Sequence, residues 1–343
     1  MMGLFGKIAG WFRGRPEESA GPAPARRAPT APDAGAEPAP EAPKPEGADI
    51  LRRVAGFRTP TPAGEPPDSA LNELLHIVEN RLQNESFELP MLPQATLQVL
   101  DFLADPKVDV VNITRMISRD QVLATSTLKM VNSAFYRGEK EITDLRQAVV
   151  RIGLYQLKLL MLTISAHTII LQGKGVTPLA RRLWEHSVGC AVFGQRLAMY
   201  LTLEDESASF VAGLLHDIGK VVVLEIIRDV SWEMERKLPV DHVLTRLFDG
   251  HHERIGGIIG RAWKLPEATV TVITGHHKAP AGPHACAVAM MILTNQMCRT
   301  GDDAAPLIAT GALAAAGLTE DSLRVFLKDF ADMTAEIAHR LEM

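Results

Sequence analysis

The amino-acid sequence predicts an all-α protein, in which a two-lobed helical domain follows a disordered arm rich in Pro and Ala. Three observations lead to this fold class. Apolar residues recur at spacings of three and four from Ser69 onward, strand-like alternation is scarce, and no alternation of strand and helix patterns appears. The content of 46% hydrophobic and 22% charged residues suits a globular protein. With only 5% aromatic residues, the core must be built mainly from aliphatic side chains.

The N-terminal arm has two parts. Residues 1–15 form a basic amphipathic segment, and a helix at 3–13 could lie on an anionic membrane or dock into a protein partner. Its apolar residues are Leu4, Phe5, Ile8, Trp11 and Phe12. Residues 16–68 contain 13 of the 22 prolines and lack apolar periodicity, which predicts a disordered linker.

The helical domain is expected to occupy residues 69–343. The 3.6-residue pattern appears in five segments before the middle of the chain: 69–83, 96–105, 108–120, 121–136 and 145–172. Pro90 and Pro93 separate the first two of these helices. The sequence GKGVTP at 173–178 then breaks the pattern and divides the domain into an N-terminal lobe at 69–175 and a second lobe at 176–300.

C-terminal helices are expected at 301–343. Thr319 is a suitable N-cap, and Glu320 and Asp321 place negative charge in the first turn of the last helix. One apolar stripe then consists of Leu323, Phe326, Phe330, Met333, Ile337 and Leu341.

Charge and cysteine content narrow the class of protein. The formal net charge of −5 argues against a protein that mainly binds nucleic acid. Cys190, Cys286 and Cys298 are widely spaced, which favours reduced thiols in a cytoplasmic protein. No apolar run reaches 18 residues, so we expect a cytoplasmic chain, either free or held at the inner membrane through residues 3–13.

Polar residues interrupt four otherwise apolar helical segments. They are His186 in LWEHSVGCA, His216 and Asp217 in LLHDIGK, His252 in HHERIGG, and His276 and His277 in ITGHH. A buried imidazole beside a buried carboxylate needs a partner, and helical bundles build metal sites from such residues. Neutral imidazoles with one carboxylate suit Fe, Mn, Zn, Ni or Co, and Lys220 lies one turn after Asp217, where it could meet a phosphate.

The other histidines are interpreted as ordinary core, surface or loop residues. His76, His167, His242 and His339 fall on helical patterns as single residues, whereas His251 and His284 are expected in loops.

The four motifs, in this order, resemble the HD superfamily of metal-dependent phosphohydrolases. The upstream half is similar to one branch, the HDOD domain or HD-related output domain of bacterial signalling proteins. That similarity lies in LPMLPQATLQVLDFLADP, ISRDQVLATSTLKMVNSAFY and ITDLRQAVVRIGLYQLKLLML, with the Asn132-Ser133 pair and the Ala148–Gly153 segment. The resemblance covers about residues 85–300 and implies an all-α bundle of two lobes.

The resemblance also implies a ligand set. It assigns the metal ligands of active HD enzymes to His186, His216 and Asp217. The further ligands of the HD-GYP phosphodiesterase branch correspond to His252, His276 and His277. The position of the closing Asp ligand holds Asn295, and KAPAGPHA replaces the Gly-Tyr-Pro signature. An amide supplies less negative charge than a carboxylate, so we expect a degenerate site.

Three interpretations therefore compete. The first is a non-catalytic regulatory module that acts on signalling proteins. The second is a metal-dependent phosphohydrolase of a nucleotide or cyclic dinucleotide, in which Asp217 and Lys220 would be catalytic. The third is a metal site with a structural or sensory role only.

Overall fold

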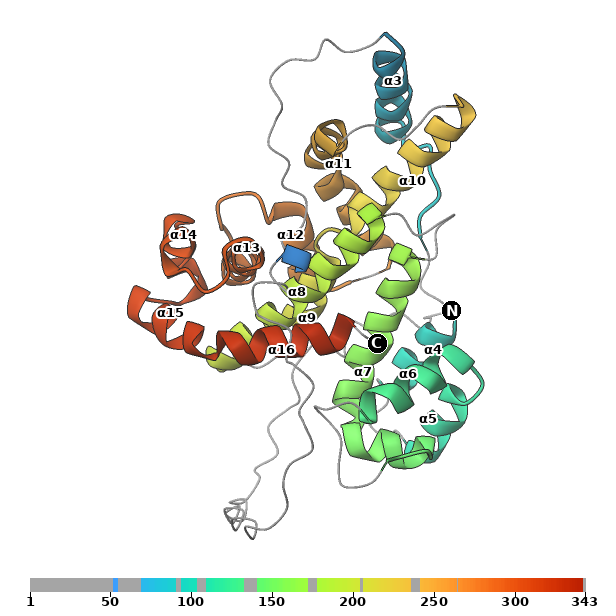
Figure 1. Cartoon of the computed structure of the whole chain (residues 1–343), viewed down its shortest axis with the longest axis vertical. Coiled ribbons are helices and arrows are strands. Elements are labelled where there is room, and N and C mark those ends of the chain that lie inside the picture. Colours follow the sequence, from blue (N-terminus) through green and yellow to red (C-terminus); the bar gives the residue numbers. More distant parts are fainter. Residues whose placement is uncertain are drawn as a thin grey trace.

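The computed structural model of the chain describes most of the residues from Ser69 onward and a short piece before it. The described ranges are 52–54, 69–90, 94–103, 109–132, 141–171, 178–203, 206–235, 241–263 and 265–341. They contain helices and turns and no strand, which confirms the all-α prediction (Figure 1). The predicted helix at 3–13 and most of the predicted linker lie outside these ranges.

The helices follow one another closely along the chain. The first half consists of α3 (Ser69–Gln83), α4 (Gln94–Leu103), α5 (Val110–Ile117), α6 (Gln121–Val131), α7 (Leu145–Leu171) and α8 (Pro178–Tyr200). The second half consists of α9 (Glu206–Leu215), α10 (Ile218–Glu233), α11 (Asp241–Ala262), α12 (Glu267–Gly275), α13 (Ala285–Thr300), α14 (Ala304–Ala309), η1 (Ala314–Ala316), α15 (Glu320–Phe326), η2 (Leu327–Asp329) and α16 (Phe330–Leu341).

Two hydrophobic cores underlie the two lobes. The smaller core joins α4, α5 and α6 to α7 as far as Met161, and Ile113 and Leu157 are fully buried in it. The larger core is centred on α8 to α13, with Phe193 and Ile255 fully buried. Helix α7 contributes to both cores and connects the lobes (Figure 1).

Helix α3 belongs to the second lobe, which corrects the expected boundaries of the N-terminal lobe. Its buried residues Leu74, Val78 and Leu82 are part of the larger core. Figure 1 shows α3 beside α10 and α11, far from α4 to α6. The apolar stripe of α3 predicted a helix correctly, but a stripe does not specify which neighbouring helix will cover it.

Two predicted helices are broken in the structure. Gly153 in α7 has φ +75, and just beyond it the parts Leu145–Leu154 and Leu157–Leu171 are bent by 101° relative to one another. The expected final helix is interrupted by η2, although Thr319 caps α15 through a capping box with Ser322, as predicted for the N-cap. In both places the apolar spacing continues through the break, so the pattern alone does not reveal it.

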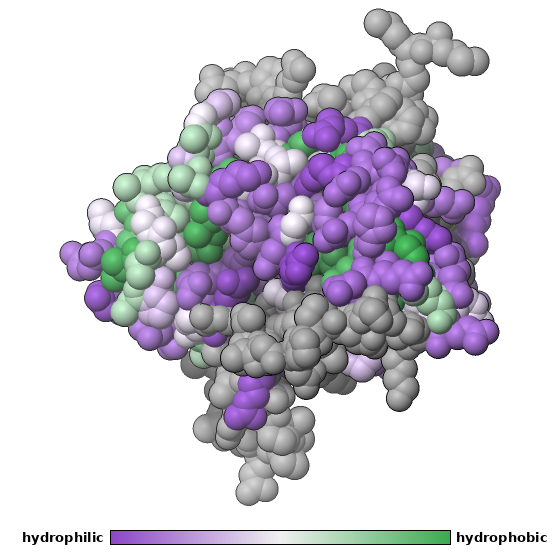
Figure 2. Space-filling model, turned by 90° about the horizontal axis from the view of Figure 1, so that it is seen from above, coloured by the Kyte–Doolittle hydropathy of each residue, from purple (hydrophilic) through white to green (hydrophobic). Residues whose placement is uncertain are grey.

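Length and hydropathy determine whether a helix can cross a membrane. Among the described residues, no single helix is long and apolar enough to cross a membrane, and only the two bent parts of α7 reach that length together. Figure 2 shows a face that is mostly hydrophilic, with separate hydrophobic areas between.

Candidate metal centre

Helices from distant parts of the sequence bring the predicted polar residues together. Helix α8 carries His186, and the turn between α9 and α10 consists of His216 and Asp217. Helix α11 carries His252, and His276 is the C-cap residue of α12. All five side chains are buried, none more than 3% exposed. The centre therefore lies inside the larger core.

Close helix packing makes this convergence possible. A Cβ atom at Gly219 would lie 2.0 Å from the carbonyl oxygen of His252, and one at Gly256 would lie 2.6 Å from Cγ2 of Ile273. Helices α10, α11 and α12 thus approach so closely at these two positions that only glycine fits. This approach brings Nε2 of His252 to 3.6 Å from Oδ1 of Asp217.

The four buried imidazoles have the same hydrogen-bonding pattern at Nδ1. In each ring, Nδ1 lies within hydrogen-bond distance of a backbone carbonyl, which can only accept, so Nδ1 carries the proton of the neutral ring. The carbonyls belong to Val54 (2.7 Å from His186), Gly213 (2.8 Å from His216), Phe248 (2.6 Å from His252), and Val272 and Ile273 (3.2 and 3.1 Å from His276). The backbone thereby fixes the tautomer that leaves Nε2 unprotonated, which is the form that binds a metal.

Asp217 lies between two sets of Nε2 atoms. Its Oδ2 is 3.3 Å from Nε2 of His216 and 3.7 Å from Nε2 of His186. Its Oδ1 is 3.6 Å from Nε2 of His252 and 3.5 Å from Nε2 of His276. The carboxylate thus divides the cluster into two halves.

This arrangement of acceptors fits a bound cation. Nε2 of His252 and Nε2 of His276 are 3.2 Å apart, and in the tautomers set by the backbone neither carries a proton. Nε2 of His216 and Oδ1 of Asp217 are buried without a hydrogen-bond partner among the described residues. Buried lone pairs that face one another are unfavourable unless a positive charge lies between them, and imidazole with carboxylate is a typical ligand set for a transition metal. The predicted ligands therefore fit a divalent metal.

Comparison with known proteins assigns the fold that carries these residues. The HDOD domain matches residues 89–279, more than half of the chain, from the start of the first lobe to the His276-His277 pair. The chain belongs to the HDOD domain family. The resemblance seen in the sequence motifs is thereby confirmed.

Solved structures share the architecture of this HDOD chain. An HDOD domain protein from Geobacter sulfurreducens is 24% identical, with a TM-score of 0.58 over 78% of this chain and 98% of that one. A Shewanella amazonensis SB2B protein designated a metal-dependent phosphohydrolase is 17% identical, with a TM-score of 0.55 over 77% of this chain and 98% of that one. A Marinobacter aquaeolei VT8 protein designated a signal transduction protein is 17% identical, with a TM-score of 0.56 over 86% of this chain and 65% of that one. At these identities the likeness is one of fold.

One curated relative is closer in sequence. It is a protein of Treponema pallidum (strain Nichols), named uncharacterized, which is 31% identical over 203 residues, or 57% of this chain. The match spans 39% of the relative's own length.

Electrostatics in the HDOD chain keep Asp217, His252 and His276 in their metal-binding forms, whereas for His186 burial is outweighed by contacts with Cys190 and Asp217, which raise its pKa. Burial opposes ionisation of Asp217, but its charge interactions with His216 and Lys220 outweigh burial and hold its pKa well below the usual range. Nζ of Lys220 lies 2.5 Å from Oδ2 of Asp217. Burial lowers the pKa of His252 to about 4 and the pKa of His276 to about 3. At neutral pH the carboxylate is thus ionised and these two imidazoles are uncharged.

These shifts predict how the stability of the metal-free protein depends on pH. Histidines in the unfolded chain titrate near 6.5, so between that pH and about 4 the unfolded state binds more protons than the folded state. The free energy of unfolding should therefore decrease as the pH is lowered below about 6.5, by up to about 1.4 kcal/mol per pH unit for each of His252 and His276. Urea unfolding of chelator-treated protein measures this slope, and the double variant His252→Asn/His276→Gln should flatten it. A wild-type stability that is constant between about pH 6.5 and 4.5 would contradict the prediction.

Two further predicted ligands are not among these five buried side chains. His277 is exposed, although its ring centroid lies 4.2 Å from that of His276 and 5.2 Å from that of His252. Asn295 is buried on α13, and its amide oxygen has no hydrogen-bond partner among the described residues. It lies one helical turn before Cys298, on the side of α13 that contacts α8.

The remaining histidines lie away from the centre or outside the described side chains. His76 is exposed, and His167 packs edge-on against Trp184 at 5.0 Å between ring centroids. His284 precedes α13. His251 lies inside α11, so its expected place in a loop is wrong, because adjacent histidines can occupy neighbouring faces of one helix as readily as a turn. The side chains of His242 and His339 are not among those described.

The linker prediction is wrong at residues 52–54. These residues form a helical turn, Val54 is fully buried in the larger core, and its carbonyl oxygen accepts the hydrogen bond from His186. Nε and Nη2 of Arg53 lie 3.2 and 3.1 Å from Oε1 of Glu185. Gly189 on α8 makes room, since a Cβ there would lie 2.8 Å from Cβ of Val54. A contact of three residues has no periodicity by which the sequence could predict it.

Loosening this segment should weaken the metal centre. Arg53→Glu places like charges beside Glu185, so the Val54 carbonyl should no longer hold His186 in place. Loss of such a supporting hydrogen bond typically lowers metal affinity by roughly 10- to 100-fold. Competition with a chelator measures this affinity, and the charge swap Arg53→Glu/Glu185→Arg should restore part of it.

Arg52 supplies the matched control, because its side chain is exposed. If Arg52→Glu weakened metal binding as much as Arg53→Glu, the effect would come from overall charge and not from docking.

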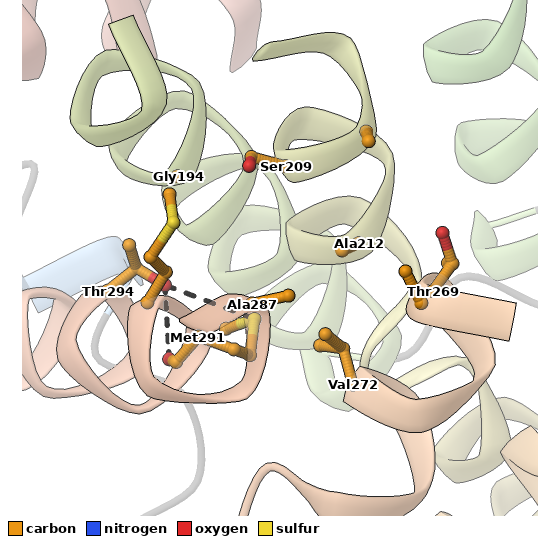
Figure 3. Close-up of a pocket in the computed structure, with 11 residues that line it drawn as sticks. Gly194, Ser209, Ala212, Thr269, Val272, Ala287, Met291 and Thr294 are labelled. Carbon is orange, nitrogen blue, oxygen red and sulfur yellow. Dashed lines mark hydrogen bonds between the residues drawn. The ribbon is translucent and has the colours of Figure 1, made fainter. Parts of the chain in front are cut away.

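Two cavities lie apart from the histidine cluster. One of about 50 Å³ lies between α8, α9, α12 and α13, with Ala212, Val272 and Thr294 in its walls (Figure 3). Another of about 390 Å³ lies between the lobes, with Lys129 and Trp184 in its walls. Neither cavity is lined by the buried histidines or by Asp217, so neither provides space for a substrate beside the carboxylate.

Proposed function

We propose that this HDOD chain is a regulatory module of bacterial signal transduction that retains a metal centre but does not hydrolyse phosphate esters. The observation that carries the proposal is the shortage of carboxylates. Asp217 is the one carboxylate within 4 Å of the four buried imidazoles among the described residues, and Lys220 already pairs with it.

The chain's own residues would hold a metal in this centre. His186 and His216 present Nε2 to one oxygen of Asp217, and His252 and His276 present Nε2 to the other. Such a metal, when bound, can bind phosphate oxygen and activate water. Activated water is favoured by anionic surroundings, and here the position expected for a second acid holds the neutral amide of Asn295.

A regulatory role would act through surfaces of the bundle. The partners of such a module are signalling proteins, and residues 3–13 are a candidate docking segment for a partner or for the inner membrane. The fold shared with a protein designated a signal transduction protein supports this direction.

The alternative is a metal-dependent phosphohydrolase that acts on a nucleotide or a cyclic dinucleotide. One observation favours it. His186, His216 and Asp217 form one group with ligand atoms within 4.8 Å of one another, and His252, His276 and His277 form another. Two groups beside a shared carboxylate could hold two metal ions, and Lys220 could contact a phosphate.

Turnover measurements decide between the two functions. Chain purified without an affinity tag should bind metal, yet show no hydrolysis of cyclic dinucleotides or other nucleotides with Mn²⁺, Fe²⁺ or Ni²⁺. Robust turnover that disappears in Asp217→Ala would establish the enzyme instead. Asn295→Asp is the complementary variant, since restoring the acid should raise metal affinity if the amide weakens the site.

A further inference from the structure

A second group of potential ligands adjoins the histidine cluster. Sγ of Cys190 lies 3.7 Å from Nε2 of His186 and 3.5 Å from Sγ of Cys298. The three ligand atoms lie within 4.8 Å of one another, and all three side chains are buried, the two thiols fully. The ordinary interpretation of this group is a pair of core thiols joined by a weak hydrogen bond.

The positions of the two cysteines are those of helical metal ligands. His186 and Cys190 are four residues apart on α8, so both point from one face of the helix. Cys298 lies three residues after Asn295 on α13. Helix α13 thus lacks the acid one turn earlier but carries a potential anionic ligand at Cys298.

We propose that His186, Cys190 and Cys298 form a second metal site, selective for a thiophilic divalent cation such as Zn²⁺. Imidazole and two thiolates are a usual ligand set for Zn²⁺, with Zn–S near 2.3 Å and Zn–N near 2.0 Å. In a tetrahedral site these bond lengths separate the ligand atoms by about 3.5–3.8 Å. The observed Sγ–Sγ separation of 3.5 Å and Nε2–Sγ separation of 3.7 Å each lie within about 0.3 Å of the tetrahedral values, and all three ligand atoms lie within 4.8 Å of one another, so small side-chain adjustments suffice.

Charge balance favours this site over the histidine cluster for a soft cation. Binding of Zn²⁺ displaces the two thiol protons to solvent, and two thiolates neutralise the ion completely. In the histidine cluster Asp217 offers one negative charge, and Lys220 already offsets it. A neutral assembly is the less costly one in a buried place.

The two sites share one ligand. Nε2 of His186 is 3.7 Å from Sγ of Cys190 and also 3.7 Å from Oδ2 of Asp217. A single lone pair can serve one ion, so Zn²⁺ on the thiol side removes His186 from the Asp217 group. This competition exists whether or not the histidine cluster hydrolyses phosphate esters.

Cobalt titration tests the site directly. Reduced, metal-free full-length chain is titrated with Co²⁺ without oxygen, and thiolate ligation appears as a charge-transfer absorption band in the near ultraviolet. We expect this band in the wild type, its loss in Cys190→Ser and in Cys298→Ser, and its displacement by Zn²⁺. Cys286→Ser is the matched control and should keep the band, because Cys286 lies outside the group.

Two other outcomes would contradict the proposed second metal site. Absence of the band when Co²⁺ is bound, or its persistence in both serine variants, would show that the thiols are core residues only. If the serine variants do not fold, X-ray absorption of the Zn²⁺-loaded wild type decides, with two sulfur ligands expected and none contradicting the site. The band reports thiolate ligation and not turnover, so its failure is distinct from a failure of the regulatory proposal.

Discussion

Replacing Gly219 with alanine should destabilise the protein by about 3 kcal/mol or more, because overpacking against immovable atoms exceeds the usual range of 1–3 kcal/mol. The new Cβ would lie 2.0 Å from the carbonyl oxygen of His252 and 2.7 Å from the backbone nitrogen of Gly256. Both atoms belong to the backbone of α11, so relief requires movement of a whole helix. Urea or thermal unfolding measures the loss.

Gly250 provides the control on α11. It is exposed, and a Cβ there meets nothing within 4 Å. Gly250→Ala should therefore stabilise the helix by about 0.5–1 kcal/mol, the difference in helix propensity. Equal stabilities of Gly219→Ala and wild type would mean that α10 and α11 do not approach as closely as the structure shows.

The second large effect is expected for Asp217→Asn. The change removes the carboxylate that faces four imidazoles, so metal affinity should fall by at least about 100-fold, since even supporting residues contribute 10- to 100-fold. It also leaves Lys220 without its partner in a buried place, which typically destabilises by about 3–5 kcal/mol. Metal competition and urea unfolding measure the two effects separately.

Removing the lysine as well separates these roles. In Asp217→Asn/Lys220→Met the unpaired charge is gone, so stability should recover while metal affinity stays low. Asp229→Asn, on the same helix with a partly exposed side chain that lies 3.8 Å from Nε of Arg228, is the charge-matched control and should leave metal affinity unchanged. Unimpaired metal binding in the double variant would exclude Asp217 as a ligand.

The helices could be predicted from the sequence because most of them bury only one face, which gives regular apolar spacing. Apolar spacing identified α3 and α7, but it could not show that α3 packs on α10, since partner choice depends on the assembled core. It also ran through Gly153, where a positive φ turns the chain without changing the pattern.

Part of the candidate site could also be predicted from the sequence, but for a different reason. Buried polar residues such as His216 and Asp217 stand out in apolar segments, and the family motifs grouped them with His252 and His276. The contact between Val54 and His186 has no such signal, because a backbone carbonyl can belong to any residue. Cys190 had a weak signal, its spacing of four from His186, which gains meaning only when Cys298 is seen beside it.

The hydrogen bond between Val54 and His186 makes the two ends of that contact thermodynamically reciprocal. If a bound metal favours the docked position of residues 52–54 by some factor, docking must strengthen metal binding by the same factor. A partner protein that binds residues 52–54 and displaces them from α8 would then bind more weakly to the metal-loaded form. The same coupling free energy would then appear in two separate measurements, because the metal would lower partner affinity by the same factor by which the partner lowers metal affinity.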